Sequence, residues 1–264
     1  MKTETAAARS LEMTAEMQKP GLRLLAWCAS LPYVLSYLSL LVLWHPVCML
    51  SKLFGQRAMD FVFYCVNRSL LLPLSIVGTR LTIRSRDDIP NDRPLLIVSN
   101  HQSFHDINII ATAYGKYHPK FVAKTQLARW IPSVSFVLRH FGSVLIDRDN
   151  PRQALPALAK FAAFIEARRF SAVIFPEGTR ARDGQMKAFK PSGILSLLKH
   201  MPSAIIVPCV MKNSWLLVRD HWMPAPLGLK VELEMLEPID PAQYAKDELT
   251  GIIEARIREA LMRG

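Results

Sequence analysis

The chain has 264 residues, enough for one sizeable domain with an appendage, and half of them are hydrophobic. Its 33 Lys and Arg against 22 Asp and Glu give a formal net charge of +11, which favours anionic partners such as lipid headgroups, phosphorylated molecules or an acidic protein. The sequence has no zinc knuckle, recognition-helix pattern or aromatic RNA-binding signature, so no nucleic-acid partner is expected. Its four cysteines show no metal-type or redox spacing.

Hydropathy divides the chain into three predicted segments. Residues 1–21 form a polar leader, residues 22–79 form hydrophobic, membrane-anchoring helices, and residues 80–264 form an α/β domain. In the last segment short apolar runs alternate with longer helical patterns. The predicted fold class is therefore α/β, a mixed sheet flanked by helices and preceded by a membrane-embedded two-helix module.

The first apolar stretch contains no Lys, Arg, Asp or Glu between Arg23 and Lys52. As a continuous helix it would exceed the roughly 20 residues that cross a bilayer. Pro32 and Pro46 inside it predict breaks or kinks.

The second apolar stretch, from Phe61 to Thr79, contains Asn67 and Arg68. An Arg in the middle of a bilayer costs several kcal/mol, so this stretch is a poor independent span. Two arrangements remain open: a hairpin that dips into one leaflet, which we favour, and a two-span anchor. Both place the N-terminus and the α/β domain on the same side, and the flanking basic residues indicate the cytoplasmic side.

The α/β domain has a predicted order of strands and helices. Strands are expected near residues 81–83, 95–99, 120–123, 143–146, 172–175, 204–210 and 229–235. Helices are expected at 106–117, in an interrupted stretch up to 140, and at 151–169, 194–200 and 247–261. Asn150 is the expected N-cap of the third of these helices, with a proline in its first turn.

A histidine and an aspartate, His101 and Asp106, follow the predicted strand at 95–99. In a regular helix, residues five apart point roughly 140° away from each other, so the two side chains can meet only if the chain turns at His101. The aspartate would then accept the imidazole N–H, and the other ring nitrogen could take a proton from a hydroxyl. The pair is a candidate general base with its orienting partner; a helix-capping Asp beside an incidental surface His is the alternative.

His101 and His105 also form a His-x-x-x-His pattern, next to Asp106, which is a possible pair of metal ligands. The other histidines form no second such pattern. No metal site is therefore expected.

Two further loops follow predicted strands. One carries Asp147 and Arg148, and would deliver a guanidinium to the edge of the sheet where α/β proteins bind ligands, although a surface ion pair is the better explanation of this segment read alone. The other is Phe175–Arg180, with sequence Phe-Pro-Glu-Gly-Thr-Arg. Its glycine permits close approach to a ligand, and Arg180 can bind a phosphate through two parallel hydrogen bonds.

The chain contains four segments in this order: Asn-His-x4-Asp from Asn100, Gly-x3-Ile-Asp-Arg from Gly142, Phe-Pro-Glu-Gly-Thr-Arg from Phe175 and the Val-Pro strand at Val207. Together they resemble the motifs of the glycerophospholipid acyltransferase family. The bacterial 1-acyl-glycerol-3-phosphate acyltransferases are the most similar branch. The resemblance covers about residues 80–215, and the hydrophobic N-terminal helices are also similar.

The resemblance implies transfer of a fatty acyl group from acyl-CoA or acyl-carrier protein to the free hydroxyl of 1-acyl-glycerol-3-phosphate, at the bacterial inner membrane and with no cofactor. His101 would be the base and Asp106 its partner. The residues implied in substrate binding are Lys124, Arg148, Glu177, Gly178, Thr179 and Arg180.

This chain departs from the family pattern close to the implied acceptor site. Ala181 stands where many members have serine, and Pro191 stands where a Lys-Gly pair is more usual. Another lysophospholipid or a lyso-aminolipid therefore remains an alternative acceptor. A non-catalytic lipid-binding protein is a third interpretation, and the intact His101–Asp106 pair argues against it.

Overall fold

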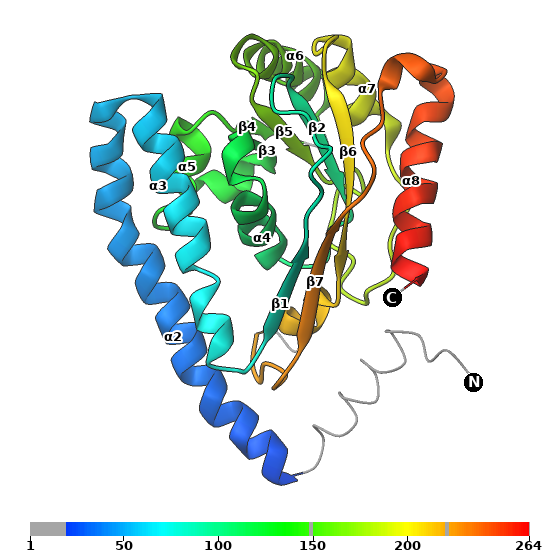
Figure 1. Cartoon of the computed structure of the whole chain (residues 1–264). Helices are drawn as coiled ribbons and strands as arrows, with labels where there is room; N and C mark the ends of the chain where they lie inside the picture. The colour runs from blue at the N-terminus through cyan, green and yellow to red at the C-terminus, as the bar shows by residue number, and fades with distance from the viewer. Residues whose placement is uncertain (1–19, 148–149, 220–221, 264) are drawn as a thin grey trace, which may run out of the picture.

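Seven strands form one mixed sheet in the computed structural model, which describes residues 20–147, 150–219 and 222–263 (Figure 1). The strand order is β1-β7-β6-β2-β5-β3-β4, and every neighbouring pair is parallel except β6 with β7. The strands are β1 (Arg80–Arg84), β2 (Leu95–Ser99), β3 (Pro119–Lys124), β4 (Val144–Ile146), β5 (Ser171–Ile174), β6 (Ile205–Lys212) and β7 (Lys230–Met235). The predicted α/β class with a mixed sheet is confirmed.

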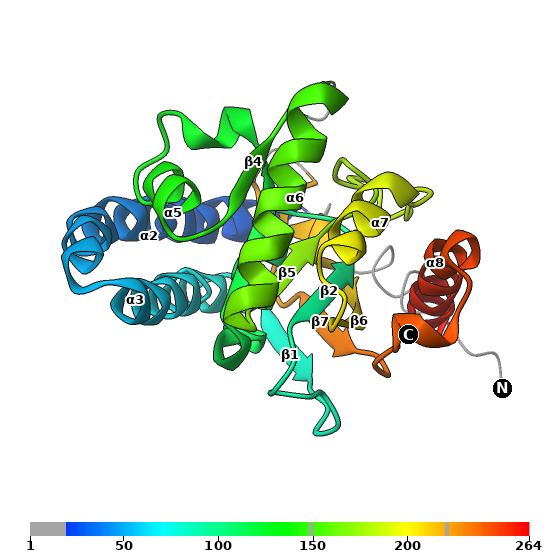
Figure 2. The same ribbon diagram turned by 90° about the horizontal axis from the view of Figure 1, so that it is seen from above.

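Helices cover both faces of this sheet (Figure 2). They are α2 (Pro20–Ser51), α3 (Gln56–Ser69), α4 (His105–Ala113), α5 (Val134–His140), α6 (Pro151–Arg168), α7 (Pro191–Lys199) and α8 (Lys246–Met262). The single helix expected at 106–117 is α4 followed by a short 3-10 turn, Gly115–Tyr117. Gly115 begins this turn and lies against the Tyr64 ring, where a Cβ would come within 2.5 Å of a ring carbon.

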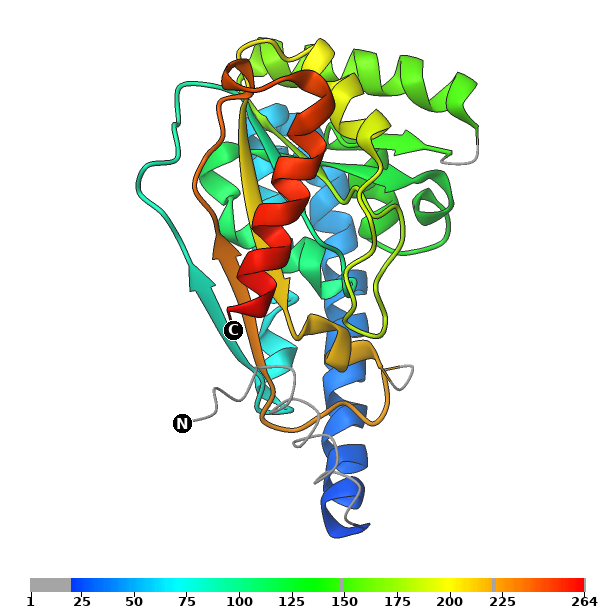
Figure 3. The same cartoon turned by 90° about the vertical axis from the view of Figure 1, so that its right-hand side faces the viewer.

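The central strand β2 is buried on both sides, so it is a continuous apolar run instead of an alternating one. Leu95 and Ile97 belong to the core beneath α3 and α4, while Leu96 and Val98 belong to the core beneath α6, α7 and α8. In Figure 3, α8 lies in front of the sheet and α2 behind it.

The N-terminal helices α2 and α3 form a hairpin beside the sheet (Figure 1). The α2 helix runs through both Pro32 and Pro46, so the predicted breaks do not occur. Each proline removes one backbone hydrogen bond. Side chains next to the prolines contact the α/β domain: Ser30 Oγ accepts from the Ala225 N–H at 2.7 Å, and His45 Nδ1 accepts from the Ser133 N–H at 2.9 Å.

The opposite side of α2 is an exposed apolar face. Its large exposed side chains are Leu22, Leu24, Leu25, Trp27, Leu31, Leu35, Leu38, Val42, Leu43, Val47, Met49 and Leu50. Within the described part of the chain, one helical stretch, Gly21–Phe54, is long and apolar enough to cross a membrane by length and composition, with a mean hydropathy of 1.7.

Two polar side chains of α3, Asp60 and Asn67, face the domain, whereas Arg68 is exposed. Asn67 is buried, and its Oδ1 accepts from Asn108 Nδ2 on α4 at 3.0 Å. Asp60 forms an ion pair with Lys120 of β3, and both side chains are almost fully buried. These contacts fix the hairpin to the sheet.

Candidate active site

Parallel strands bring the predicted site segments to one edge of the sheet. β2 pairs in parallel with β5 and with β6, and β3 pairs in parallel with β5 and with β4. The carboxyl ends of these strands therefore share the edge where ligands bind in α/β folds. His101 follows β2, Glu177 follows the neighbouring β5, and Lys124 ends β3.

The expected contact between His101 and Asp106 is present. The chain turns after β2, and α4 begins only at His105, so the two side chains are not separated by a regular helix. The imidazole Nδ1 donates to Asp106 Oδ2 at 2.9 Å. Since Nδ1 is engaged, Nε2 is the ring nitrogen that can accept a proton from a hydroxyl.

Asp106 is fully buried and accepts from four further donors. Its Oδ2 accepts from the N–H groups of Gln102 at 2.6 Å and Ser103 at 2.8 Å. Its Oδ1 accepts from the hydroxyls of Ser103 at 3.2 Å and Ser214 at 2.5 Å. The carboxylate is therefore held in one orientation, which in turn fixes the imidazole.

Ser214 and Phe175 are not among the site residues that the sequence predicts. Ser214 reaches Asp106 from just beyond β6, a neighbour of β2 that only the strand order reveals. Phe175 stacks on the His101 ring, with ring centroids 4.1 Å apart and planes 19° from parallel. Its sequence signal is its place at the start of the Phe-Pro-Glu-Gly-Thr-Arg segment.

Glu177 joins the loop after β5 to the histidine segment. Its Oε1 accepts from the His101 N–H at 2.7 Å, and its Oε2 accepts from the Lys187 N–H at 2.8 Å. The Ala181 N–H donates to the His101 carbonyl at 2.7 Å. The carboxyl is buried, and this burial raises its pKa. Both carboxyl oxygens of Glu177 therefore accept hydrogen bonds from backbone N–H groups.

The rest of this loop forms a basic rim beside the histidine. Arg180 is partly buried, and this burial is the larger cause that lowers the pKa of its guanidinium. The positive charge of Arg182 lowers this pKa further. The Lys187 ammonium donates to Thr179 Oγ1 at 2.8 Å. At Gly178 the backbone φ is +76°, and a Cβ there would lie 3.5 Å from the Lys190 ammonium. An anion at this rim would meet several positive charges.

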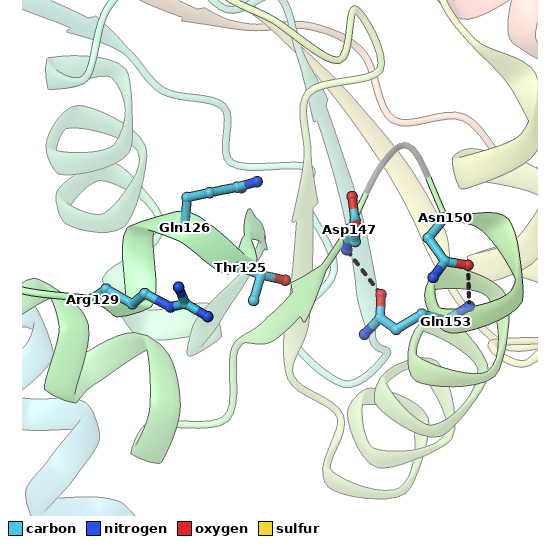
Figure 4. A pocket seen from close by; sticks show the side chains of 6 residues that line it. All are labelled: Thr125, Gln126, Arg129, Asp147, Asn150 and Gln153. Atoms are coloured by element: carbon cyan, nitrogen blue, oxygen red, sulfur yellow. Dashed lines mark hydrogen bonds between the residues drawn. The ribbon is translucent and has the colours of Figure 1, made fainter.

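Lys124 lies further along the same edge, opposite Ile146 of β4. A pocket of about 360 Å³ opens beyond it, lined by Thr125, Gln126, Arg129, Asp147, Asn150 and Gln153 (Figure 4). The Asp147 N–H donates to Gln153 Oε1 at 2.8 Å. Arg148, which the sequence also places in the site, lies outside the described residues.

His105 is a buried packing residue that connects α4 to α2. The Tyr33 hydroxyl lies 2.6 Å from its Nε2 in a hydrogen bond, and burial lowers the pKa of His105 to about 3. Across residues 20–147, 150–219 and 222–263, no three His, Cys, Asp or Glu side chains form a group that could hold a metal ion.

Comparisons with known proteins agree with this geometry. A family model described as acyltransferase matches residues 80–212. The 1-acyl-sn-glycerol-3-phosphate acyltransferase of Escherichia coli (strain K12) is 30% identical over 194 residues, which cover 70% of this chain and 75% of that one. The human 1-acyl-sn-glycerol-3-phosphate acyltransferase alpha is 30% identical over 231 residues, covering 85% of this chain and 76% of that one.

A solved structure shows the same fold. The 1-acyl-sn-glycerophosphate acyltransferase of Thermotoga maritima aligns with a TM-score of 0.72 at 21% identity, over 89% of this chain and 93% of that one. Together with the family match, these relatives show that the chain belongs to the acyltransferase family and is an enzyme of the 1-acyl-sn-glycerol-3-phosphate acyltransferase type.

Proposed function

We propose that this enzyme transfers a fatty acyl group from acyl-CoA or acyl-carrier protein to the free hydroxyl of 1-acyl-glycerol-3-phosphate, forming phosphatidic acid. The observation that supports this proposal most directly is the contact between the histidine segment after β2 and the basic loop after β5. The His101–Asp106 pair is hydrogen-bonded to the basic loop through Glu177. A proton acceptor and a phosphate-attracting rim therefore lie side by side.

His101 acts as the general base. Its Nε2 removes the proton from the acceptor hydroxyl while that oxygen attacks the thioester carbonyl. The tetrahedral intermediate then collapses, the new ester C–O bond remains, and the thiolate leaves with the proton from the imidazolium. Asp106 keeps the imidazole in the required tautomer through Nδ1. A backbone N–H or a basic side chain of the loop stabilises the oxyanion.

The acceptor phosphate binds at the basic rim. Arg180 supplies a guanidinium suited to two parallel hydrogen bonds, and Gly178 and Thr179 let the backbone approach the ligand. Lys124 binds from the end of β3. The position of Glu177 between two backbone N–H groups supports a role in holding this loop in place.

The α2–α3 hairpin lies in one leaflet of the bacterial inner membrane, with the α/β domain on the cytoplasmic side. The inner face of α2 contacts the domain from Ser30 to His45, about 22 Å of helix. The hydrocarbon core is about 30 Å thick, so an upright α2 would draw the α/β domain into it. Lying flat, α2 places only its exposed apolar face among the acyl chains.

The test offers purified full-length protein a panel of lysolipids with acyl-CoA and acyl-carrier-protein donors. We expect lysophosphatidic acid to be acylated with the highest kcat/KM. A preference for a lysolipid without a phosphate monoester would instead support the alternative acceptors that Ala181 and Pro191 leave open. Acylation of none of the acceptors would contradict the proposed reaction.

A further inference from the structure

The most exposed large hydrophobic side chain among the described residues is Trp130, which is 96% exposed. It belongs to the segment 127–131, here named the Trp130 loop, between β3 and α5. Its backbone φ is +67°, a left-handed conformation that bulky residues rarely adopt. The chain therefore adopts an unfavourable conformation at a residue whose indole contacts almost nothing in the protein.

The Trp130 loop is fixed beside the exposed face of α2. Two residues beyond it, Ser133 Oγ donates to the Leu41 carbonyl at 2.5 Å, and the Ser133 N–H donates to His45 Nδ1 at 2.9 Å. Residues three and four positions from His45 lie on the same side of the helix. Of these, Leu41 and Cys48 are buried against the domain, whereas Val42 and Met49 are exposed. The loop therefore lies along the border of the apolar face of α2.

Two arginines lie beside the indole. Trp130 borders a shallow depression of about 400 Å³ that it shares with Ala128, Arg129 and Arg139. Both arginines are exposed. Trp is favoured at the headgroup level of a bilayer, where its ring is amphipathic, and arginines near an anionic surface are attracted to lipid phosphates.

We propose that the Trp130 loop is a second membrane contact of this enzyme, with its indole at the headgroup level and Arg129 and Arg139 bound to phosphates of anionic lipids. This inference rests on the proposed seating of α2 in one leaflet. The α2–α3 hairpin holds one end of the molecule in the leaflet. A further contact at the Trp130 loop limits the tilt of the α/β domain about the hairpin, and with it the height of the catalytic edge above the lipid.

An acidic carrier protein is the rival partner for the two arginines. It does not account for an exposed indole that continues the apolar face of a helix. The charge and the indole are explained together by an anionic bilayer, so the bilayer is the partner that the surface fits best.

The test measures how the full chain partitions onto sedimenting vesicles, made either of phosphatidylcholine alone or with phosphatidylglycerol added. Trp130→Ala should weaken partitioning about tenfold on both vesicles, and Trp130→Phe should restore part of it. Arg139→Gln should weaken it about fivefold, on the anionic vesicles only. The matched controls are Met262→Ala, an exposed apolar residue on α8, and Arg168→Gln, at the end of α6, which packs on the opposite face of the sheet from α5.

Acylation in detergent micelles separates this inference from the proposed reaction. Trp130→Ala should acylate micellar lysophosphatidic acid from acyl-CoA as fast as the unsubstituted enzyme does. Partitioning equal to that of the unsubstituted enzyme would overturn the membrane contact. So would a loss seen only with the acyl-carrier-protein donor, which would mark a protein-docking surface. Failure of the unsubstituted enzyme in micelles would instead contradict the proposed reaction and leave the partitioning result intact.

Discussion

His101, the proposed base, is held by contacts from four directions: Asp106 at Nδ1, Phe175 on its ring face, Glu177 at its N–H and Ala181 at its carbonyl. Because the imidazole is restrained in this way, little reorganisation energy is needed when an acceptor hydroxyl binds. The orientation of the base is therefore a property of its neighbours as much as of the His101–Asp106 hydrogen bond.

Ser214→Ala should slow acyl transfer without unfolding the enzyme. The substitution removes one charge-assisted hydrogen bond to Asp106, at 2.5 Å, and we expect kcat to fall roughly tenfold with little change in KM. Steady-state kinetics with lysophosphatidic acid provide the measurement. Ser171→Ala is the control, because Ser171 is equally buried but donates to the Tyr117 carbonyl at 2.9 Å, away from the site. Equal effects of the two substitutions would show that Ser214 has no positioning role.

His105 should make stability depend on pH. Its pKa is about 3 in the folded chain, so on acidification the unfolded chain takes up this proton first, near the ordinary value of 6.5. The contribution of neutral His105 to the free energy of unfolding is therefore complete above pH 6.5. Below pH 6.5 this contribution declines, by up to about 1.4 kcal/mol per pH unit. Thermal unfolding at pH 7.5, 6 and 5 should therefore show a smaller decline for His105→Gln, which keeps a partner for the Tyr33 hydroxyl. Parallel curves for the two proteins would contradict this role.

At the scale of elements, the α2–α3 hairpin is joined to the sheet by polar contacts inside an otherwise apolar interface. The Asp60–Lys120 ion pair is the most buried of them. Removing one partner of a buried pair leaves an uncompensated charge, which costs about 3–5 kcal/mol, whereas replacing both partners by apolar residues is often nearly neutral.

Asp60→Asn should therefore lower the free energy of unfolding by about 3–5 kcal/mol, and the double variant Asp60→Leu, Lys120→Met should recover most of that loss. Denaturant titrations of the three proteins in one detergent give the comparison. If the double variant is as unstable as Asp60→Asn, the ion pair is not what holds α3 to β3.

Local sequence signals predicted the elements well. Asn150 caps α6 through its side chain, which accepts from the Gln153 N–H, and Leu95–Ser99 forms β2 within the predicted bounds. No local sequence signal predicts the order of the strands in the sheet. The placement of Ser214 beside Asp106 depends on β6 lying next to β2, a contact between residues 108 positions apart. The continuity of α2 through its prolines likewise depends on tertiary contacts.

At the scale of the whole molecule, the apolar face of α2 and the net charge of +11 should act together on an anionic membrane. Apolar burial resists salt, while attraction between exposed charges is screened as the Debye length falls from about 10 Å at 0.1 M to about 3 Å at 1 M.

Partitioning onto anionic vesicles should therefore weaken severalfold between 0.1 and 1 M salt, and then level off at the value found on neutral vesicles. Sedimentation of the full-length chain with each kind of vesicle gives both curves. Complete release from neutral vesicles at high salt would show that the apolar face of α2 does not hold the enzyme on the membrane.

The central claim, that His101 oriented by Asp106 removes the proton from the acceptor hydroxyl, is tested most directly by the acylation rate of purified His101→Ala. Lysophosphatidic acid and acyl-CoA are the substrates, and thermal unfolding confirms that the variant is folded. We predict a fall in kcat on the order of 100-fold or more, and a large fall also for Asp106→Asn. A folded His101→Ala enzyme that acylates lysophosphatidic acid at the rate of the unsubstituted enzyme would contradict the account.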